Sequence, residues 1–296
     1  MQAQFPIQRK MANLKELRNR ITSVSSTMQI TSAMKMVSAA KLSKAQDAIT
    51  QMRPYSQKLT ELLQALSATL DEDSGSKYSE QREVKNVLIV AISSNRGLAG
   101  AFNSNIVKGV RQLATSKYEG KNVFLYTLGK KSNDVLKKTF NISTSNNAIY
   151  DTPDYENVAK IAEDLMEIFV EGKFDEIVLM YNQFKNAATQ LVTTEQFLPI
   201  EQVENDSNVV LDYIFEPSKE EIVKDLIPKS LKMQLFKAIS DSIASEHGAR
   251  MTAMHKATDN ATDLRNALKL SYNKARQASI TNEILEIVGG AEALNK

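Results

Sequence analysis

The stretch best suited to binding a phosphate group runs from Ser93 to Asn103. It follows an apolar, strand-like run and precedes a helical pattern, which is where a doubly wound α/β domain holds a phosphate. Its glycines follow the pattern Gly97-x-x-Gly100, which matches neither the GxGxxG fingerprint nor a Walker A loop. The next strand-like run also ends without an acidic residue that could hold a ribose. These residues therefore favour a structural turn over a nucleotide site.

The other residue types that perform chemistry are scattered. The histidines His247 and His255 lie more than two helical turns apart, and neither has a carboxylate at metal-ligand spacing. The sequence contains no cysteine, which excludes disulfides, thiolate zinc sites and cysteine nucleophiles. No serine lies in a GxSxG elbow, and no two carboxylates share an apolar setting as an acid–base pair. We therefore expect no catalytic residue, no metal site and no cofactor.

The longest uninterrupted pattern runs from Ser230 to Glu292 and contains no proline. At about 1.5 Å per residue it predicts one helix of roughly 90 Å, longer than a compact domain of this size is wide. Its thin apolar face, rich in Ala, Met and Thr, suits close contact with another helix. The alternative is an ordinary core helix, but such helices are usually much shorter. Its apolar residues recur at helical spacing: Leu231, Leu235, Ile239, Ile243, Met251, Met254, Ala257, Ala261, Leu264 and Leu268.

A second long helical pattern opens the chain, with Asn13 as its N-cap and Glu16 in the capping-box position. Its apolar or small residues alternate steps of three and four, as in a heptad seam. We expect a bend at Pro54 and a helix end near Leu70. The two long helices most simply pack antiparallel, and a parallel homodimer is the alternative. The seam is predicted at Leu14, Leu17, Ile21, Val24, Met28 and Thr31, and less regularly at Met34, Val37, Ala40 and Ala45.

Between the two helices, apolar runs alternate with helical stretches, which predicts βαβ units and a mainly parallel sheet. The closing strands follow one another without a helix, so we expect an antiparallel edge hairpin. Ser218 and Glu221 form a capping box for the closing helix, and Pro228 predicts a kink. Strands are predicted at 86–93, 122–128, 176–184, 190–198 and 208–213, and a weaker one at 142–150. Helices are predicted at 103–117, 130–140 and 154–171.

The predicted fold class is therefore α/β plus coiled coil, in which long antiparallel N- and C-terminal helices enclose a Rossmann-like α/β domain. The predicted segments are an N-terminal extension (1–12), a coiled-coil helix (13–70), a linker (71–84), an α/β domain (85–217) and a second coiled-coil helix (218–296).

Charge and hydropathy limit the partners. The 296-residue chain has a formal net charge of only +2, so we expect no nucleic-acid partner. No apolar run approaches the length of a membrane span, so we expect no direct insertion into a membrane. Basic residues nevertheless dominate from Arg9 to Arg53, where Glu16 and Asp47 are the acidic residues. This end of the chain should meet an acidic surface.

Three segments carry a family resemblance: Arg20–Gln46, Arg250–Ala261 and Leu270–Ala291. They closely resemble the terminal helices of the gamma subunit of F-type ATP synthases, the rotating central stalk, and the Gly97–Asn103 loop is also similar. The resemblance implies a non-catalytic subunit that couples ion flow to ATP synthesis and hydrolysis on beta subunits. It also implies a peripheral location at the cytoplasmic face of a bacterial plasma membrane.

The implied partners are the alpha and beta subunits of the catalytic head, an epsilon-type subunit and a membrane ring of c subunits. Exposed ion pairs with beta-subunit loops would be weak, typically under about 1 kcal/mol, and so could be broken and remade at each step. For each implied residue the alternative is an ordinary coiled-coil position. The implied interface residues are Met34, Lys35, Lys41, Lys44, Arg250, Gln277, Thr281 and Glu283.

Two readings of other classes compete with this one. A nucleotide-binding α/β enzyme on a coiled-coil scaffold would need a phosphate loop and a catalytic group. A free coiled-coil adaptor would form a stable homodimer.

Overall fold

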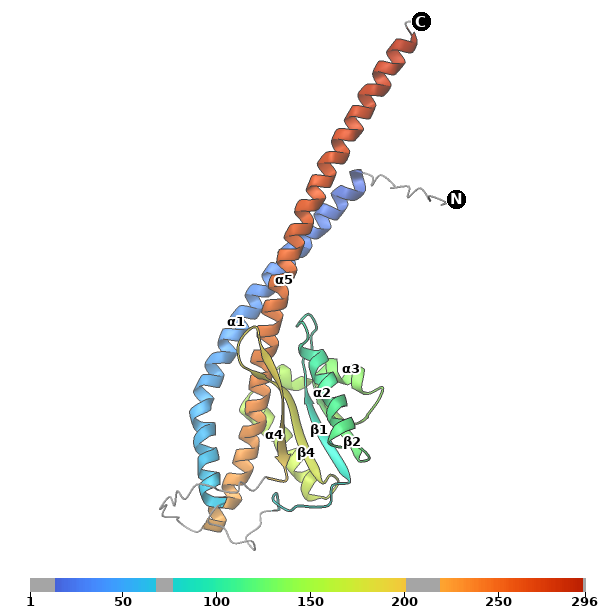
Figure 1. Ribbon diagram of the computed structural model, residues 1–296. Coiled ribbons are helices and arrows are strands. Elements are labelled where there is room, and N and C mark those ends of the chain that lie inside the picture. The colour runs from blue at the N-terminus through green and yellow to red at the C-terminus, as the bar shows by residue number, and fades with distance from the viewer. Residues whose placement is uncertain (1–13, 68–76, 201–218, 295–296) are drawn as a thin grey trace. The chain divides into compact units, whose positions relative to one another are not determined.

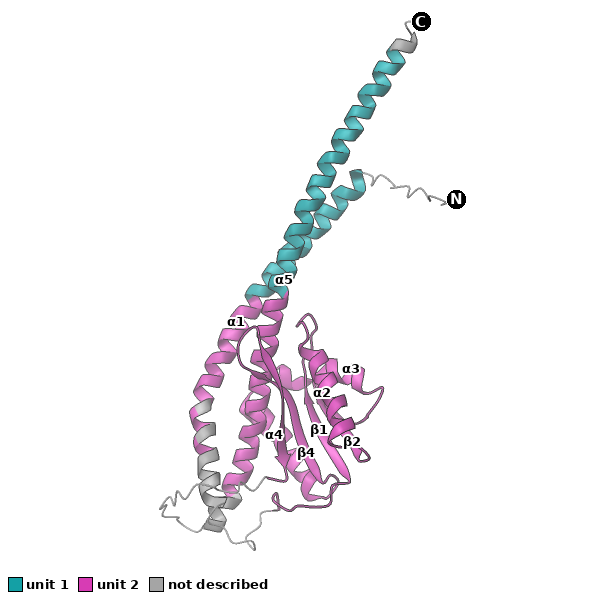
Figure 2. Cartoon of the chain, viewed as in Figure 1, with its two compact units in different colours: residues 1–36, 254–296 teal, residues 37–253 magenta. Residues whose placement is uncertain are grey.

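The computed structural model describes residues 14–67, 77–200 and 219–294 (Figure 1). The chain divides into two compact units (Figure 2). Unit 1 comprises residues 1–36 and 254–296, and unit 2 comprises residues 37–253. No described helix is long and apolar enough to span a membrane.

The two long helices are confirmed. α1 spans Leu14–Ser67 and α5 spans Lys219–Leu294, with lengths of 54 and 76 residues. Pro54 and Pro228 lie inside these helices, so neither proline ends its helix. The predicted caps Asn13 and Ser218 lie outside the described residues.

Unit 2 contains a sheet with strand order β3-β2-β1-β4-β5. β1 pairs in parallel with both β2 and β4, β2 pairs in parallel with β3, and β4 pairs antiparallel with β5. The mainly parallel sheet with an antiparallel edge hairpin is thus confirmed, whereas the strand predicted at 208–213 lies outside the described residues. The strands are β1 (Asn86–Ile92), β2 (Asn122–Leu128), β3 (Asn141–Asn146), β4 (Glu176–Phe184) and β5 (Gln190–Leu198). The weaker strand predicted at 142–150 ends early, because Ala148–Tyr150 form a short 3₁₀ helix, η2.

Helices cover both faces of this sheet. α2 (Phe102–Ser116) and α3 (Lys130–Leu136) pack on the face that carries Val87, Ile89 and Ala91. α4 (Tyr155–Val170) packs on the opposite face. Because β1 is buried on both faces, all of its residues from Val87 to Ile92 are apolar and inaccessible to solvent.

The part of α5 within unit 2 is a core helix. Leu231, Leu235 and Ile239 are buried in the same cluster as Leu88 and Val90 of β1. The core-helix alternative therefore holds for this part of the closing helix. Because the compact units cut both long helices, the segment boundaries proposed from the sequence stay predictions.

In unit 1, α1 and α5 run antiparallel. As the residue number of the contacting residue increases along α1, the number of its partner on α5 decreases by nearly the same amount. The successive contacts are Arg18–Tyr272, Met28–Thr262, Thr31–Thr258 and Lys35–His255. Thr31 and Thr258 share a hydrogen bond of 2.8 Å between their hydroxyl groups. Polar side chains thus contribute to this seam.

The seam along α1 follows the predicted heptad as far as Thr31 and then departs from it. It continues through Lys35, Ser38 and Leu42, which keeps the alternation of steps of four and three. Val37, predicted in the seam, is 57% exposed, and Ala40 is also exposed. The prediction was wrong here because it followed apolar residue types where the helix turns polar ones inward.

A similar correction applies to α5. Thr258, Ala261, Arg265 and Leu268 lie on its less exposed side, again at heptad spacing, whereas the predicted seam residue Leu264 is 52% exposed. Both corrections show that spacing, more than residue type, determines which sides of α1 and α5 are buried.

A glycine allows the start of α3 to pack closely against the end of β1. Gly129 precedes α3 with a φ of 102°, and an added Cβ would lie 2.6 Å from the carbonyl oxygen of Ser93. The Ser93 hydroxyl donates to the Ser132 hydroxyl at 2.8 Å and accepts from the Ser132 backbone N–H at 3.1 Å. The close approach at Gly129 brings these buried groups together.

We expect Gly129→Ala to lower the free energy of unfolding of unit 2 by about 2–3 kcal/mol, because the methyl group collides with backbone atoms. Gly120→Ala is the matched control, since Gly120 also has a positive φ of 76° but nothing within 4 Å of an added Cβ. Backbone strain alone should cost about 1 kcal/mol there. Urea unfolding followed by circular dichroism measures both, and equal losses would contradict the steric explanation.

Candidate functional site

The loop after β1 is the phosphate-like turn singled out in the sequence. The Ser94 backbone N–H donates to the Asn103 side-chain oxygen at 3.0 Å, and the Ser94 hydroxyl donates to the Arg96 carbonyl at 2.6 Å. Leu98 has a positive φ of 61° and its side chain is 64% exposed. The loop is therefore closed by its own side chains.

The turn after β4 lies at the same end of the sheet. The Asn186 side-chain oxygen accepts from the backbone N–H groups of Ala188 and Thr189 at 3.0 and 2.7 Å. Asparagine makes this kind of side-chain turn readily, and here the turn joins β4 to β5.

α5 contacts both of these loops within two helical turns. The Arg250 guanidinium donates to the carbonyl oxygens of Arg96 and Gly97 at 3.3–3.4 Å. The Thr252 hydroxyl donates to the Ala187 carbonyl at 3.0 Å. Two residues before Arg250, an added Cβ on Gly248 would lie 3.2 Å from the Ala187 Cα. A glycine is thus what lets the helix approach the turn this closely.

The position of this contact decides whether the crevice at the carboxyl ends of the strands can hold a ligand. From β1 the chain continues to β2 and β3 on one side of β1, and it then returns to β4 on the other side of β1. The carboxyl ends of β1 and β4 therefore flank the topological switch point of the sheet. Open α/β sheets bind their ligands in that crevice. Here residues 246–252 of α5 lie against the loops that follow both strands. The chain's own helix therefore occupies the place where a Rossmann-like domain binds a nucleotide.

A buried ion pair lies in the same two turns of α5. The Arg250 guanidinium lies 2.7 Å from the Glu246 carboxylate, and the two side chains are only 9% and 11% exposed. Burial raises the pKa of Glu246, while the nearby cations Arg250, Lys41 and Arg96 act in the opposite direction. Since Arg250 is committed to a carboxylate and to two loop carbonyls, it is poorly placed to bind a phosphate as well.

His247 follows the acidic member of this pair. Burial, together with the positive charges of Arg250 and Lys41, lowers the pKa of His247 to about 4. Its Nδ1 atom is buried and has no hydrogen-bond partner among the described residues. The ring is therefore neutral at pH 7 and packs as part of the interface. His255 lies in unit 1, so the two histidines form no common site.

The implied interface residues have very different surroundings. Lys41 and Lys44 are exposed, as are Gln277, Thr281 and Glu283 near the end of α5. In contrast, Arg250 is buried and bonded within the chain.

Met34 and Lys35 are half-buried, and the Lys35 amino group lies 3.5 Å from Nδ1 of His255. The eight residues therefore form no single surface.

The last part of α5 carries an exposed apolar surface. Every described side chain from Thr281 to Ala291 is exposed. The large apolar residues among those near this end are Ile280, Ile284, Leu285, Ile287 and Val288. Exposed apolar residues gathered on one helix mark a contact surface more often than a solvated one.

The sequence reasoning missed how α5 is held against the sheet, through Gly248 and Thr252 at the turn Asn186–Thr189. One signal was present. Gly248 interrupts a pattern that contains no other glycine before Gly289, and an isolated glycine in a helix often marks a close packing contact.

We expect Arg250→Ala to destabilise unit 2 by about 3 kcal/mol, because the substitution leaves the buried Glu246 carboxylate without its partner. Lys41→Ala, at an exposed site on α1, should change stability by less than about 0.5 kcal/mol. Chemical denaturation of the purified chain compares the two. Equal stabilities would show that the role of Arg250 lies outside the chain.

His247 predicts a dependence of stability on pH. Its pKa of about 4 in the folded chain lies below its ordinary value of about 6.5, so protons bind preferentially to the unfolded chain. The stability present above pH 6.5 is lost as the pH falls toward 4. After allowance for screening of the partly exposed ring, the loss should be about 1–2 kcal/mol. Denaturation of wild-type and His247→Gln chains from pH 7 to 4 isolates this contribution, and parallel curves would contradict it.

Comparisons with known proteins agree with this geometry. The protein-family model described as "ATP synthase" matches residues 13–294. A protein named "ATP synthase gamma chain" from Christiangramia forsetii is 76% identical, with 96% of this chain and 100% of that protein covered. A protein of the same name from Flavobacterium johnsoniae is 70% identical at the same coverage.

A solved structure shows the same fold at low identity. This is the Euglena gracilis mitochondrial ATP synthase, described as OSCP/F1/c-ring in rotational state 3. One of its chains superposes with a TM-score of 0.68 and 21% identity, covering 95% of this chain and 94% of that one. The family match over nearly the full length and the two close relatives lead to the same conclusion: the chain belongs to the ATP synthase gamma chain family.

Proposed function

We propose that this chain is the rotating central-stalk subunit of a bacterial, proton-translocating ATP synthase. In this role it couples ion flow through a membrane ring of c subunits to ATP synthesis and hydrolysis on beta subunits. The observation that carries the proposal is α5: one continuous helix is anchored in the sheet of unit 2, pairs with α1 in unit 1 and ends in an exposed apolar surface. Solved structures with this fold are described as central stalk and rotor.

The shape of unit 1 suits this role. Two helices of unequal extent present a different side chain in every direction around their axis. Partners arranged around them therefore meet different contacts, and each partner can be biased toward a different conformation. An effector can shift an equilibrium only through such differential contacts.

We further propose that the chain carries no catalytic site of its own, and that its partners are the alpha, beta, epsilon-type and c subunits. The nucleotide alternative is opposed by α5, which occupies the switch-point crevice. The complex is proposed to lie at the cytoplasmic face of the plasma membrane. In this proposal the segments 13–70 and 218–296 are the two helices of the rotating shaft, and the α/β domain, 85–217, is the foot of the rotor.

The interface residues have two kinds of role in this proposal. The exposed Lys41 and Lys44 meet acidic loops of beta subunits, while Gln277, Thr281 and Glu283 lie within the collar that surrounds the end of α5. Met34 and Lys35 act at the seam between α1 and α5. Arg250 acts indirectly, because its guanidinium fixes the backbone of the loop that exposes Leu98.

The test is ATP hydrolysis by matched alpha and beta subunits, with and without this chain, beside the chain alone. We expect an inert chain alone, and a stable three-subunit complex with strongly raised turnover. Truncation at Thr281 should weaken assembly or coupling, since it removes most of the exposed apolar surface.

Hydrolysis by the chain alone would overturn the proposal. So would alpha and beta subunits that stay unassembled and unchanged in its presence. A stable homodimer of the free chain would instead support the coiled-coil adaptor.

A further inference from the structure

The α/β core of unit 2 carries opposite charges on its two faces. The segment 102–140, which contains α2 and α3, has eight basic and two acidic residues, a net charge of +6. The segment 151–173, which contains α4 on the opposite face, has seven acidic and two basic residues, a net charge of −5. The basic residues of the first segment are Lys108, Arg111, Lys117, Lys121, Lys130, Lys131, Lys137 and Lys138.

Little of this positive charge is paired with acidic side chains in the part of the chain that the structure describes. Among those eight residues, only Lys117 forms an ion pair with a described residue, the buried Glu176 at 2.7 Å. Apart from Lys131, which is half-buried, all of these side chains are exposed. Within unit 2, α4 and α5 pack on the other face of the sheet, so no described helix covers the α2–α3 side. The face is thus a cationic surface that no acidic surface covers among residues 14–67, 77–200 and 219–294.

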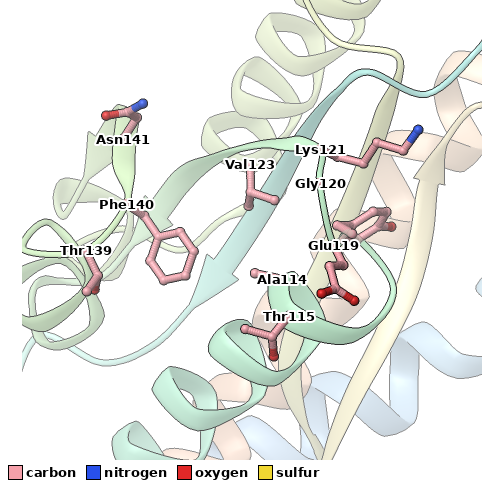
Figure 3. Close-up of a pocket in the computed structure, with 10 residues that line it drawn as sticks. Ala114, Thr115, Glu119, Gly120, Lys121, Val123, Thr139, Phe140 and Asn141 are labelled. Carbon is pink, nitrogen blue, oxygen red and sulfur yellow. The ribbon is translucent and has the colours of Figure 1, made fainter.

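The same face is hollowed near the start of β2 and β3. A cavity of about 440 Å³ lies between the end of α2 and the loop that follows α3 (Figure 3). Ala114, Val123 and Phe140 give it an apolar interior. Glu119 and Lys121 lie at its margin, and Lys137 and Lys138 immediately precede Thr139, which lines it.

The cavity lies at the amino ends of the strands. It is therefore at the edge of the sheet opposite the loops that hold α5 at Arg250 and Thr252.

We propose that the α2–α3 face is a docking surface for an acidic protein segment from another subunit of the complex. The segment inserts one apolar side chain between Ala114, Val123 and Phe140, and its carboxylates pair with Lys121, Lys137 and Lys138. An apolar centre surrounded by a charged margin is the usual anatomy of a protein interface. The proposal rests on the proposed function, since that function supplies the complex in which the partner is found.

The cavity distinguishes a protein from an anionic membrane as the occupant. A lipid surface would satisfy the positive charge, but it presents no fixed side chain that fits a concave apolar site. A protein segment accounts for both features. Its negative charges are attracted by the basic face, and the insertion of one apolar side chain into the cavity fixes its position there.

The first experiment is carbodiimide coupling on the purified intact complex, which joins a lysine to a carboxylate in direct contact with it. We expect Lys121, Lys137 or Lys138 to be coupled to aspartate or glutamate residues of one other subunit, as identified by mass spectrometry. Lys160 is the control, because it is exposed on the acidic α4 and should form no coupling to that other subunit. Acetylation of Lys121, Lys137 and Lys138 should also be slower in the complex than in the free chain.

A pair of charge-reversal variants tests the location. Lys121→Glu, at the cavity margin, should weaken retention of that subunit by about tenfold, because it places like charges opposite one another. Lys108→Glu makes the same change in charge at an exposed site on α2 that does not line the cavity, and it should have a much smaller effect. Ala114→Trp fills the cavity without changing the charge and should weaken retention as Lys121→Glu does.

Three outcomes would overturn the proposal. One is equal acetylation of the three lysines in the free chain and the complex. Another is equal effects of Lys121→Glu and Lys108→Glu. The third is binding of the free chain to phosphatidylglycerol vesicles that Lys121→Glu abolishes while the complex stays intact. Each is separable from failure of the proposed function, because assembly with alpha and beta subunits and stimulation of their ATP hydrolysis are measured on the same preparations.

Discussion

The structure of unit 2 depends on how closely α5 approaches the carboxyl edge of the sheet. Gly248 makes the approach possible, since any side chain there would press against the backbone of Ala187. Once the helix lies that close, Arg250 can reach the carbonyl groups of the loop after β1, and Thr252 can reach the turn after β4. Both loops are then held by the same two helical turns. These contacts add to the burial of Leu231, Leu235 and Ile239 in the core, which also holds α5 against the sheet.

The same approach explains why an apparently ligand-binding fold has no accessible ligand crevice. A doubly wound sheet gathers its loops at the switch point whether or not a ligand is bound there. In this chain Arg250, which is paired with the buried Glu246, contacts the loop after β1 at that end of the sheet. Burying charges is unfavourable unless they are paired and hydrogen-bonded, and Arg250 meets both conditions. The arrangement of strands and loops that binds nucleotides in other Rossmann-like domains holds a helix of the same chain in this protein.

Much of the fold could be predicted from the sequence because its signals are local. The strands of unit 2 are short apolar runs between turns, and the α1 seam as far as Thr31 is made of residues whose type and spacing agree. Beyond Thr31 the two signals disagree, because the helix turns Lys35 and Ser38 inward and leaves Val37 exposed. Periodicity decided this conflict, since a continuous helix cannot move its buried side by one residue without a break.

The contacts of Arg250 could not be predicted in the same way, because the loop it binds lies about 150 residues earlier in the chain. Family resemblance identified Arg250 as a residue of interest, but burial and bonding show how it is held. Gly248 was the visible sign that α5 packs closely against something. Nothing local in the sequence says that the neighbour is the turn after β4.

The seam of unit 1 has a thermodynamic consequence. Thr31, Thr258 and Ala261 take positions that Leu or Ile fill in most coiled coils, so few apolar atoms are removed from water there. The heat-capacity change of unfolding follows the apolar area exposed, and it is small when that area is small. The free energy of unfolding of this helix pair should therefore change with temperature along a nearly straight line, whereas that of the apolar α/β core follows a strongly curved profile. Cooling therefore weakens the hydrophobic contribution to the stability of the core more than it weakens that of the helix pair.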